Sequence, residues 1–359
     1  MPTFRGSVAD DDGLLMRQFT FLLTPVSPFR LEFTAWALRR RSGNAIDRWD
    51  GTRYRRVLAL GARAAEVAVT QVGARVRITV TGDRLPSSTK AVASATLKRM
   101  LGLQADLSPF YRLAAQDGRL YALARRFHGL KPPRFPTVFE SLINGISCQQ
   151  LSLVVGLLLL NRLAETCGLP FPGSDGTAYA FPRPQDVAAM RPGTLRRLGY
   201  STAKARTIIR VARLVATGRL DLEALADLED EAALERLTAL PGVGRWTAEY
   251  VLLRGLGRIH LFPGDDVGAR KRLARWLHLR KAPDYERVGR LLWQWRPYGG
   301  LIYFHMLLNG LAEAKELSPA GTANRYLPRT GPGPVGARPP SPSAGRAGQN
   351  PLQTATHDE

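Results

Sequence analysis

The sequence has little cysteine and no long apolar run, and these two absences exclude several classes of protein. Its 359 residues include only Cys148 and Cys167, too few for a four-thiolate iron–sulfur or zinc site and no basis for a disulfide framework. The most apolar run, residues 151–160, is shorter than the roughly 20 residues of a transmembrane helix. Three early aspartates at 10–12 do not fit a secretory signal. We therefore expect a soluble, cytoplasmic chain with no membrane partner.

Acidic residues are scarce beside basic ones. The chain has 51 Lys and Arg against 30 Asp and Glu, a net charge of +21, and a pI near 10.9. Such a surplus favours a polyanion as partner, although a bias toward arginine would give the same balance. The last forty or so residues carry few of these charges. Most of the surplus therefore belongs to the folded parts, which favours nucleic acid.

The residue patterns divide the chain into three regions. Residues 1–120 have strand-like alternation and one helical stretch, which predicts an antiparallel α+β domain. Residues 121–316 have helical periodicity and predict a helical core, and residues 317–359 have the composition of a disordered tail. The overall class is mainly α. The expected strands are residues 19–23, 29–33, 66–70 and 74–80, and the expected helices are 87–101, 136–147, 151–166, 201–217, 231–240, 245–256, 266–278 and 301–311.

Residues 231–256 predict a helix-hairpin-helix motif, in which Pro241–Gly244 joins two helices. Glycines allow a phosphate to approach the backbone, and the first N–H groups of a helix have no partner within it. Such a turn can hold DNA phosphates without reading sequence. A plain helical hairpin with a glycine turn is the alternative. The residues expected to contact DNA here are Gly242, Val243, Gly244, Arg245 and Thr247.

A second feature follows the hairpin. Residues 262–268, Phe-Pro-Gly-Asp-Asp-Val-Gly, open another helix and place Asp266 at the spacing typical of one enzyme superfamily. In these features the sequence resembles the helix-hairpin-helix DNA glycosylases with a Gly/Pro-rich loop and an essential Asp. Residues 244–250 and 295–298 are similar to the 3-methyladenine-DNA glycosylase II branch, with Pro297 as a departure.

The resemblance implies a helical glycosylase core behind an α+β domain and a function in base excision repair. It implies a monomer that acts on damaged double-stranded DNA near the nucleoid. The enzyme would flip out alkylated bases, of the 3-methyladenine and 7-methylguanine type, and leave an abasic site by hydrolysis. No cofactor or metal site is expected, apart from a monovalent cation that the hairpin turn could hold.

Asp266 is the predicted catalytic residue. Cleavage of an N-glycosidic bond builds positive charge on the sugar, and a carboxylate stabilises that charge. A simple helix N-cap is the other interpretation of Asp266, and Asp265 is the competing carboxylate. The bifunctional members have a Lys where this chain has Trp246, and an indole cannot form a Schiff base. Strand cleavage is therefore not expected.

Aromatic residues are the candidate walls of the base pocket, because an electron-poor alkylated purine stacks well on aromatic rings. The candidates are Trp246, Tyr250, Trp295, Tyr298 and, from the first domain, Phe33. Ordinary core packing is the alternative for each.

Gln149 and Gln150 lie at the bend between two apolar helices. The resemblance implies that this bend enters the duplex and fills the gap left by the flipped base. The alternative is that the two amides satisfy helix ends.

Three other functions fit parts of the pattern. A glycosylase of the same fold could act on a deaminated purine. A non-catalytic protein could use the hairpin only to bind DNA. A basic RNA-binding protein is the third.

Overall fold

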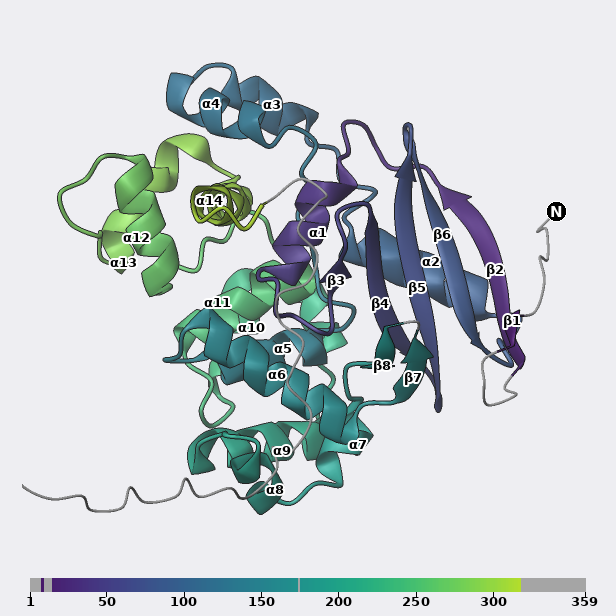
Figure 1. Ribbon diagram of the computed structural model, residues 1–359. Helices are drawn as coiled ribbons and strands as arrows, with labels where there is room; N and C mark the ends of the chain where they lie inside the picture. Colours follow the sequence, from purple (N-terminus) through teal and green to yellow (C-terminus); the bar gives the residue numbers. More distant parts are fainter. Residues whose placement is uncertain (1–7, 10–14, 174, 318–359) are drawn as a thin grey trace, which may run out of the picture. The chain divides into compact units, whose positions relative to one another are not determined.

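The computed structural model describes residues 8–9, 15–173 and 175–317 (Figure 1). The predicted tail from 318 onward lies outside these described residues. In the part that is described, no helix combines the length and apolar character needed to cross a bilayer.

A six-stranded antiparallel sheet occupies the N-terminal region, in the order β1-β2-β6-β5-β4-β3. Along β6, Val76, Ile78 and Val80 are fully buried while Arg75 and Arg77 are exposed, the alternation expected of a sheet with one covered face. The predicted hairpin at 66–80 is confirmed as β5 and β6. The strands are β1 (Val8–Ala9), β2 (Leu15–Leu23), β3 (Arg48–Trp49), β4 (Arg53–Leu60), β5 (Arg63–Val72) and β6 (Arg75–Asp83).

The predicted strand at 29–33 is wrong, because this segment enters helix α1 (Leu31–Arg39). Its alternating Phe29, Leu31 and Phe33 also fit the start of a helix, whose buried face runs through Leu31, Thr34, Ala35 and Leu38. Five residues are too few to separate the two periods. Both α1 and α2 (Thr89–Met100) pack their apolar faces in the core that the sheet shares.

The remaining described elements are mainly helical, and every predicted helix is present with ends shifted by a few residues. Ser201 caps the helix that follows it, since its hydroxyl accepts from the Lys204 N–H. The helices are α3 (Ser108–Ala114), α4 (Gly118–Arg126), α5 (Val138–Cys148), α6 (Leu153–Cys167), α7 (Pro184–Ala188), α8 (Pro192–Arg197), α9 (Thr202–Ala216), α10 (Asp230–Thr238), α11 (Arg245–Val251), α12 (Val267–Trp276), α13 (Tyr285–Leu292) and α14 (Gly299–Glu313), and a small hairpin is formed by β7 (Pro170–Gly173) and β8 (Gly176–Tyr179).

Two large apolar cores organise these elements. One core joins α5, α6, α9, α10 and α11. The other joins the sheet and α1–α4 to α12, α13 and α14, so that the C-terminal helices return to the N-terminal region. Figure 1 shows α14 next to α1 and α4, in agreement with their contacts. The hairpin belongs to the first core, and the loop before α12 lies where the chain passes from one core to the other.

Candidate active site

The hairpin turn lies between α10 and α11 and leaves its helix start open. Gly242 has φ +81°, and a Cβ there would lie 2.5 Å from the Thr207 hydroxyl oxygen, so the turn needs glycine at this point. Gly244 is the N-cap of α11 and has an ordinary φ of −93°. A Cβ on Gly244 would meet no atom within 4 Å. Gly242 therefore shapes the turn, while Gly244 leaves open space beside the start of α11.

Gln149 braces this turn from the neighbouring bend. Its amide nitrogen donates to the Gly242 carbonyl at 2.9 Å and to the Thr247 hydroxyl at 2.8 Å. Thr247 and Val243 are buried and support the turn from inside. Gln150 is exposed with φ 54°, at the tip of the bend. The two glutamines therefore differ: Gln149 is held internally, and Gln150 is available to a partner.

Arg245 links the hairpin to the loop that carries Asp266. Its Nε donates to the Asp265 carboxylate at 2.9 Å, and its guanidinium lies 3.8 Å from the centre of the Tyr285 ring. The Tyr285 hydroxyl in turn donates to Glu249 at 2.6 Å, and the Gly264 N–H donates to the same carboxylate at 3.1 Å. The loop is thus fastened to α11 at two points.

Burial raises the pKa values of both side chains in the hydrogen bond between Tyr285 and Glu249. The Glu249 side chain is almost fully buried, and burial raises the pKa of its carboxyl. Burial and the hydrogen bond to Glu249 raise the pKa of Tyr285 to about 12. The phenol therefore stays protonated and can donate at neutral pH.

Asp266 is the half-buried N-cap of α12, and both of its oxygens have donors. Oδ1 accepts from the Ala269 N–H at 2.7 Å, and Oδ2 accepts from the Tyr303 hydroxyl at 3.1 Å. Oδ1 of Asp266 therefore acts as the helix N-cap. This role leaves Oδ2 compatible with catalysis. Sequence reasoning missed Tyr303, whose one signal was a phenol in the otherwise apolar first turns of α14.

Two of the predicted pocket aromatics lie together near Asp266. The Trp246 and Tyr250 rings stack with centroids 5.6 Å apart and planes 30° apart. Burial, and to a lesser degree the charge of Asp266, raise the pKa of both Tyr250 and Tyr303. We call Asp266, Tyr303, Tyr250 and Trp246 the Asp266 cluster. It combines a fixed carboxylate with aromatic surface.

Two buried arginines lie behind this cluster. Arg40, at the end of α1, donates to the Tyr250 hydroxyl at 3.1 Å and to the Asn144 side-chain oxygen at 2.7 Å. Arg254 lies with its guanidinium 5.8 Å from the centre of the Tyr250 ring and donates to the Ala37 carbonyl at 3.0 Å. Sequence reasoning did not single out either residue.

Comparison with known families agrees with this arrangement. Residues 143–297, which include the hairpin and Asp266, match the family described as HhH-GPD superfamily base excision DNA repair protein. Residues 21–136 match the AlkA N-terminal domain. The chain belongs to the HhH-GPD superfamily. The same family assignment gives a mainly helical core behind an N-terminal sheet, as expected from the sequence.

Several relatives of this HhH-GPD protein have names that state an activity. The chain is 30% identical over 204 residues to "DNA-3-methyladenine glycosylase" of Bacillus subtilis, covering 57% of this chain and 67% of that protein. It is 25% identical over 282 residues to "DNA-3-methyladenine glycosylase 2" of Escherichia coli, covering 78% of this chain and 93% of that protein. Another B. subtilis relative, at 32% identity, is matched over 55% of its length and 45% of this chain.

Solved structures show the same fold. The "3-methyladenine dna-glycosylase from Archaeoglobus fulgidus" superposes with a TM-score of 0.71 at 27% identity, covering 80% of this chain and 97% of that one.

The other predicted pocket aromatics of this HhH-GPD protein have ring contacts outside the Asp266 cluster. Trp295 is 2% exposed and packs on Trp276, with ring centroids 4.9 Å apart. Tyr298 packs edge-on against Phe110 in the same core. Their ring contacts are those of core residues, the alternative that applies to most buried aromatics.

Phe33 contacts other residues of the core that contains the sheet. It packs edge-on against Phe127 of the α3–α4 region, with Arg30 over its face. A pocket role for Phe33 has no support from these contacts.

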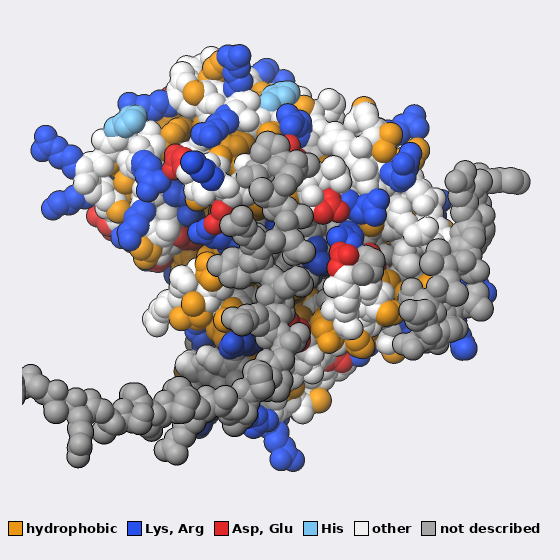
Figure 2. Space-filling model, viewed as in Figure 1, with side chains coloured by type: hydrophobic (Ala, Val, Ile, Leu, Met, Phe, Trp, Pro, Cys, Tyr) orange, Lys and Arg blue, Asp and Glu red, His pale blue; other side chains and the backbone are white. Residues whose placement is uncertain are grey.

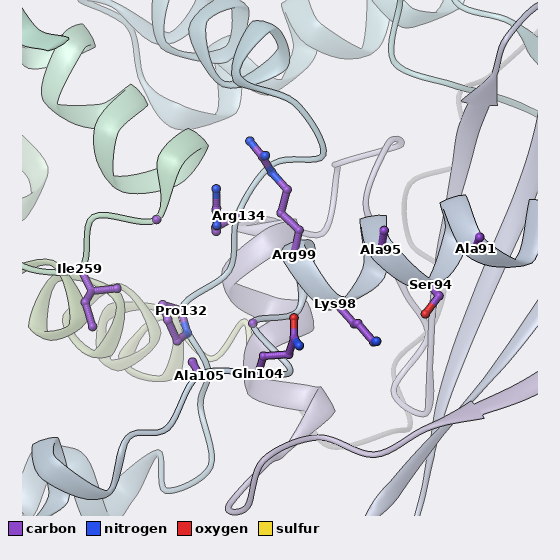
Figure 3. A pocket seen from close by; sticks show the side chains of 12 residues that line it. Ala91, Ser94, Ala95, Lys98, Arg99, Gln104, Ala105, Pro132, Arg134 and Ile259 are labelled. Carbon is purple, nitrogen blue, oxygen red and sulfur yellow. The ribbon is translucent and has the colours of Figure 1, made fainter. Parts of the chain in front are cut away.

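A groove of about 570 Å³ lies elsewhere, between α2 and residues 257–259 (Figure 3). None of the predicted site residues lines it. Arg99 and Arg134, which do, both donate to the Gly255 carbonyl. Burial and the charge of Arg99 lower the pKa of Arg134 to about 10, so it stays charged at neutral pH. The two arginines therefore satisfy the Gly255 carbonyl in the helical turn that follows α11.

The described residues contain no group of three or more His, Cys, Asp or Glu side chains that could hold a metal ion. At the hairpin, the Pro241 and Gly242 carbonyls accept hydrogen bonds from Thr207 and Gln149. A monovalent cation at this turn would share the Pro241 and Gly242 carbonyl oxygens with these donors, or would bind other oxygens of the turn. The cation site stays a prediction.

Proposed function

We propose that this protein is a monofunctional 3-methyladenine-type DNA glycosylase that removes alkylated bases from double-stranded DNA in base excision repair. The names of the B. subtilis, E. coli and A. fulgidus relatives support the substrate class. The whole-chain fold supports it as well, because both the HhH-GPD core and the AlkA N-terminal domain are matched.

One observation carries the catalytic proposal: the Asp266 carboxylate is fixed by two donors, and its charge acts on Tyr250, whose ring is stacked on Trp246. When the bond between base and sugar breaks, positive charge develops on the deoxyribose. A carboxylate that is already oriented stabilises that charge without reorganising. It also orients the water that attacks the sugar.

The aromatic rings account for base recognition. An alkylated purine with a formal positive charge stacks on an electron-rich ring face and leaves as a neutral base. A pocket of this kind needs little help from a general acid, so it tolerates several alkylated bases.

The hairpin and the bend provide the grip on DNA. The start of α11 has open space beside Gly244, and its first N–H groups can bind a backbone phosphate there. The exposed Gln150 can fill the gap left by the flipped base. Figure 2 shows lysine and arginine side chains scattered over the visible face, most of them toward its upper left, which suits non-specific attraction to DNA. We propose a monomer that acts on chromosomal DNA in the cytoplasm.

Trp246 supports hydrolysis without strand cleavage. Its indole occupies the position at which bifunctional members carry the amine nucleophile, and its ring is stacked on Tyr250. Borohydride should therefore trap no covalent complex with damaged DNA. A trapped complex would show that another amine attacks the sugar.

The proposal is tested by the identity of the released base. Purified protein is incubated with methylated duplex DNA and with duplexes that contain single hypoxanthine or other lesions, and free bases are separated by chromatography. Release of 3-methyladenine and 7-methylguanine is the expected result. Release of hypoxanthine alone would make the protein a glycosylase for deaminated purines, and binding without release would make it a DNA-binding protein only.

A further inference from the structure

Glu249 is a buried carboxylate on α11, the helix that starts at the hairpin turn. It lies four residues after Arg245 and is 3% exposed. None of the ion pairs in the part of the chain that the structure describes includes it. Burial raises the pKa of its carboxyl, and a buried carboxylate without an ion pair costs folding free energy. Fold stability alone therefore does not account for this residue.

Both carboxylate oxygens of Glu249 are used to hold the loop before α12. Oε2 accepts from the Gly264 N–H at 3.1 Å, and Oε1 accepts from the Tyr285 hydroxyl at 2.6 Å. Gly264 lies two residues before Asp266, and the Asp266 N–H donates to the Pro263 carbonyl at 3.0 Å, which closes this loop into a tight turn. The hydrogen bond to Gly264 therefore helps to fix the backbone from which Asp266 projects.

Tyr285, at the start of α13, holds the same loop with its ring as well as its hydroxyl. A Cβ on Gly264 would lie 2.6 Å from Cδ2 of the Tyr285 ring, so the ring lies directly against the loop backbone. The Arg245 guanidinium lies 3.8 Å from the centre of this ring and bonds to Asp265. Tyr285 thus contacts both the loop and the first residue of α11.

These contacts connect the hairpin to the carboxylate. Arg245 begins α11 beside the open space at Gly244, where we propose that a phosphate binds. Glu249, on the same helix, holds Gly264. The proposed phosphate contact and Asp266 are therefore joined through α11 and the Glu249 side chain. Such a connection matters for the rate, because a displacement of about 1 Å at the reacting groups can cost roughly a hundredfold.

We infer that Glu249 and Tyr285 are positioning residues, which hold the loop that carries Asp266 in a fixed place relative to the DNA-binding hairpin. They act through Asp266 and not on the base or the sugar. The inference rests on the proposed glycosylase function and deepens it. It predicts that the rate of base release depends on both side chains, whereas the affinity for DNA does not.

The test measures rate and affinity separately. Single-turnover release of 7-methylguanine and affinity for an undamaged duplex are compared among wild type, Tyr285→Phe, Glu249→Ala and Glu249→Gln. Tyr285→Phe keeps the ring and should lower the rate about tenfold, whereas Glu249→Ala removes both hydrogen bonds and should lower it about a hundredfold. Because phosphate contacts dominate affinity, each variant should bind the duplex within about twofold of wild type.

Glu249→Gln is the conservative variant. Its side-chain oxygen can accept from the Gly264 N–H, and its amide nitrogen can donate to the Tyr285 hydroxyl oxygen. Because this variant keeps the geometry without the charge, its rate should lie within about threefold of wild type. Tyr111→Phe is the matched control, since it removes a half-buried hydroxyl on α3 that accepts from the Gly129 N–H at 3.0 Å, and its rate should equal that of wild type.

The outcomes separate the inference from the proposed function. Wild-type protein that releases no methylated base ends the proposed function and the inference with it. With an active wild type, a Tyr285→Phe rate equal to that of wild type overturns the inference alone. Equal losses of rate and duplex affinity in Glu249→Ala also overturn it, because Glu249 would then only support the fold of the hairpin.

Glu249→Ala is the variant most liable to unfold, because its side chain is buried, and circular dichroism would show this. In that case the half-buried Tyr285 and the isosteric Glu249→Gln decide the matter. A slow Tyr285→Phe beside a nearly normal Glu249→Gln supports positioning. A Glu249→Gln rate about a hundredfold below wild type contradicts it, because the charge and not the geometry would then matter.

Discussion

Removing the Tyr303 hydroxyl should slow base excision. The Tyr303 hydroxyl donates to Asp266 Oδ2 at 3.1 Å, while Oδ1 has the Ala269 N–H. A hydrogen bond to a charged group contributes about 1.5–3 kcal/mol. At 3.1 Å this one is long, so the lower end applies. Since about 1.4 kcal/mol corresponds to a factor of ten in rate, Tyr303→Phe should lower the single-turnover rate about tenfold.

The direction of the effect follows from the role of the carboxylate. Catalysis needs a carboxylate that is held in place when positive charge develops on the sugar, and the Tyr303 hydroxyl is one of its two donors. The single-turnover rate of base release should therefore fall about tenfold, while duplex affinity stays within about twofold of wild type. Tyr121→Phe removes the same hydroxyl from an exposed position on α4 and is the matched control. A Tyr303→Phe rate equal to that of wild type would refute the reasoning.

Two further predictions concern the hairpin and the core. Gly242→Ala should destabilise the fold by about 1–3 kcal/mol, measured by urea unfolding, because φ is positive there and the new methyl meets Thr207. Gly244→Ala should leave stability within about 0.5 kcal/mol but weaken duplex binding, since its methyl would occupy the open approach to the helix start; equal losses of stability in the two variants would contradict this. Burial lowers the pKa of His305 from 6.5 to about 4, so its contribution to stability is complete above pH 6.5 and is lost as pH falls toward 4, by up to about 3 kcal/mol. Burial raises the pKa of Glu140 to about 7, and this group changes stability in the opposite direction over the same pH range. The test is therefore the difference in the free energy of unfolding between wild type and His305→Asn, measured across this range. A difference that does not change with pH would show that His305 does not titrate as stated.

Local features of the site were predictable from sequence because their causes are local. The hairpin turn needs glycine where φ is positive, and the N-cap at Asp266 needs a side chain that accepts from a helix N–H. Helices with a clear apolar period were also found. The short segment 29–33 failed because five residues fit both a strand and the first turn of α1.

Contacts between distant segments were not predictable. Tyr303 lies 37 residues after Asp266, and Arg40 lies 210 residues before Tyr250, so no spacing rule connects them. Trp295 illustrates the converse. Its type suits a base pocket, yet its burial against Trp276 depends on how α12 and α13 pack. Residue type identifies candidates, and only tertiary packing decides which of them meet.

The most direct test of the central claim is the single-turnover rate of 7-methylguanine release by Asp266→Asn, together with its affinity for duplex DNA. Asparagine retains the size of the side chain and an oxygen for the Ala269 N–H but lacks the charge. We predict a loss of excision on the order of a thousandfold with duplex affinity within about threefold of wild type. Excision at the wild-type rate would contradict it.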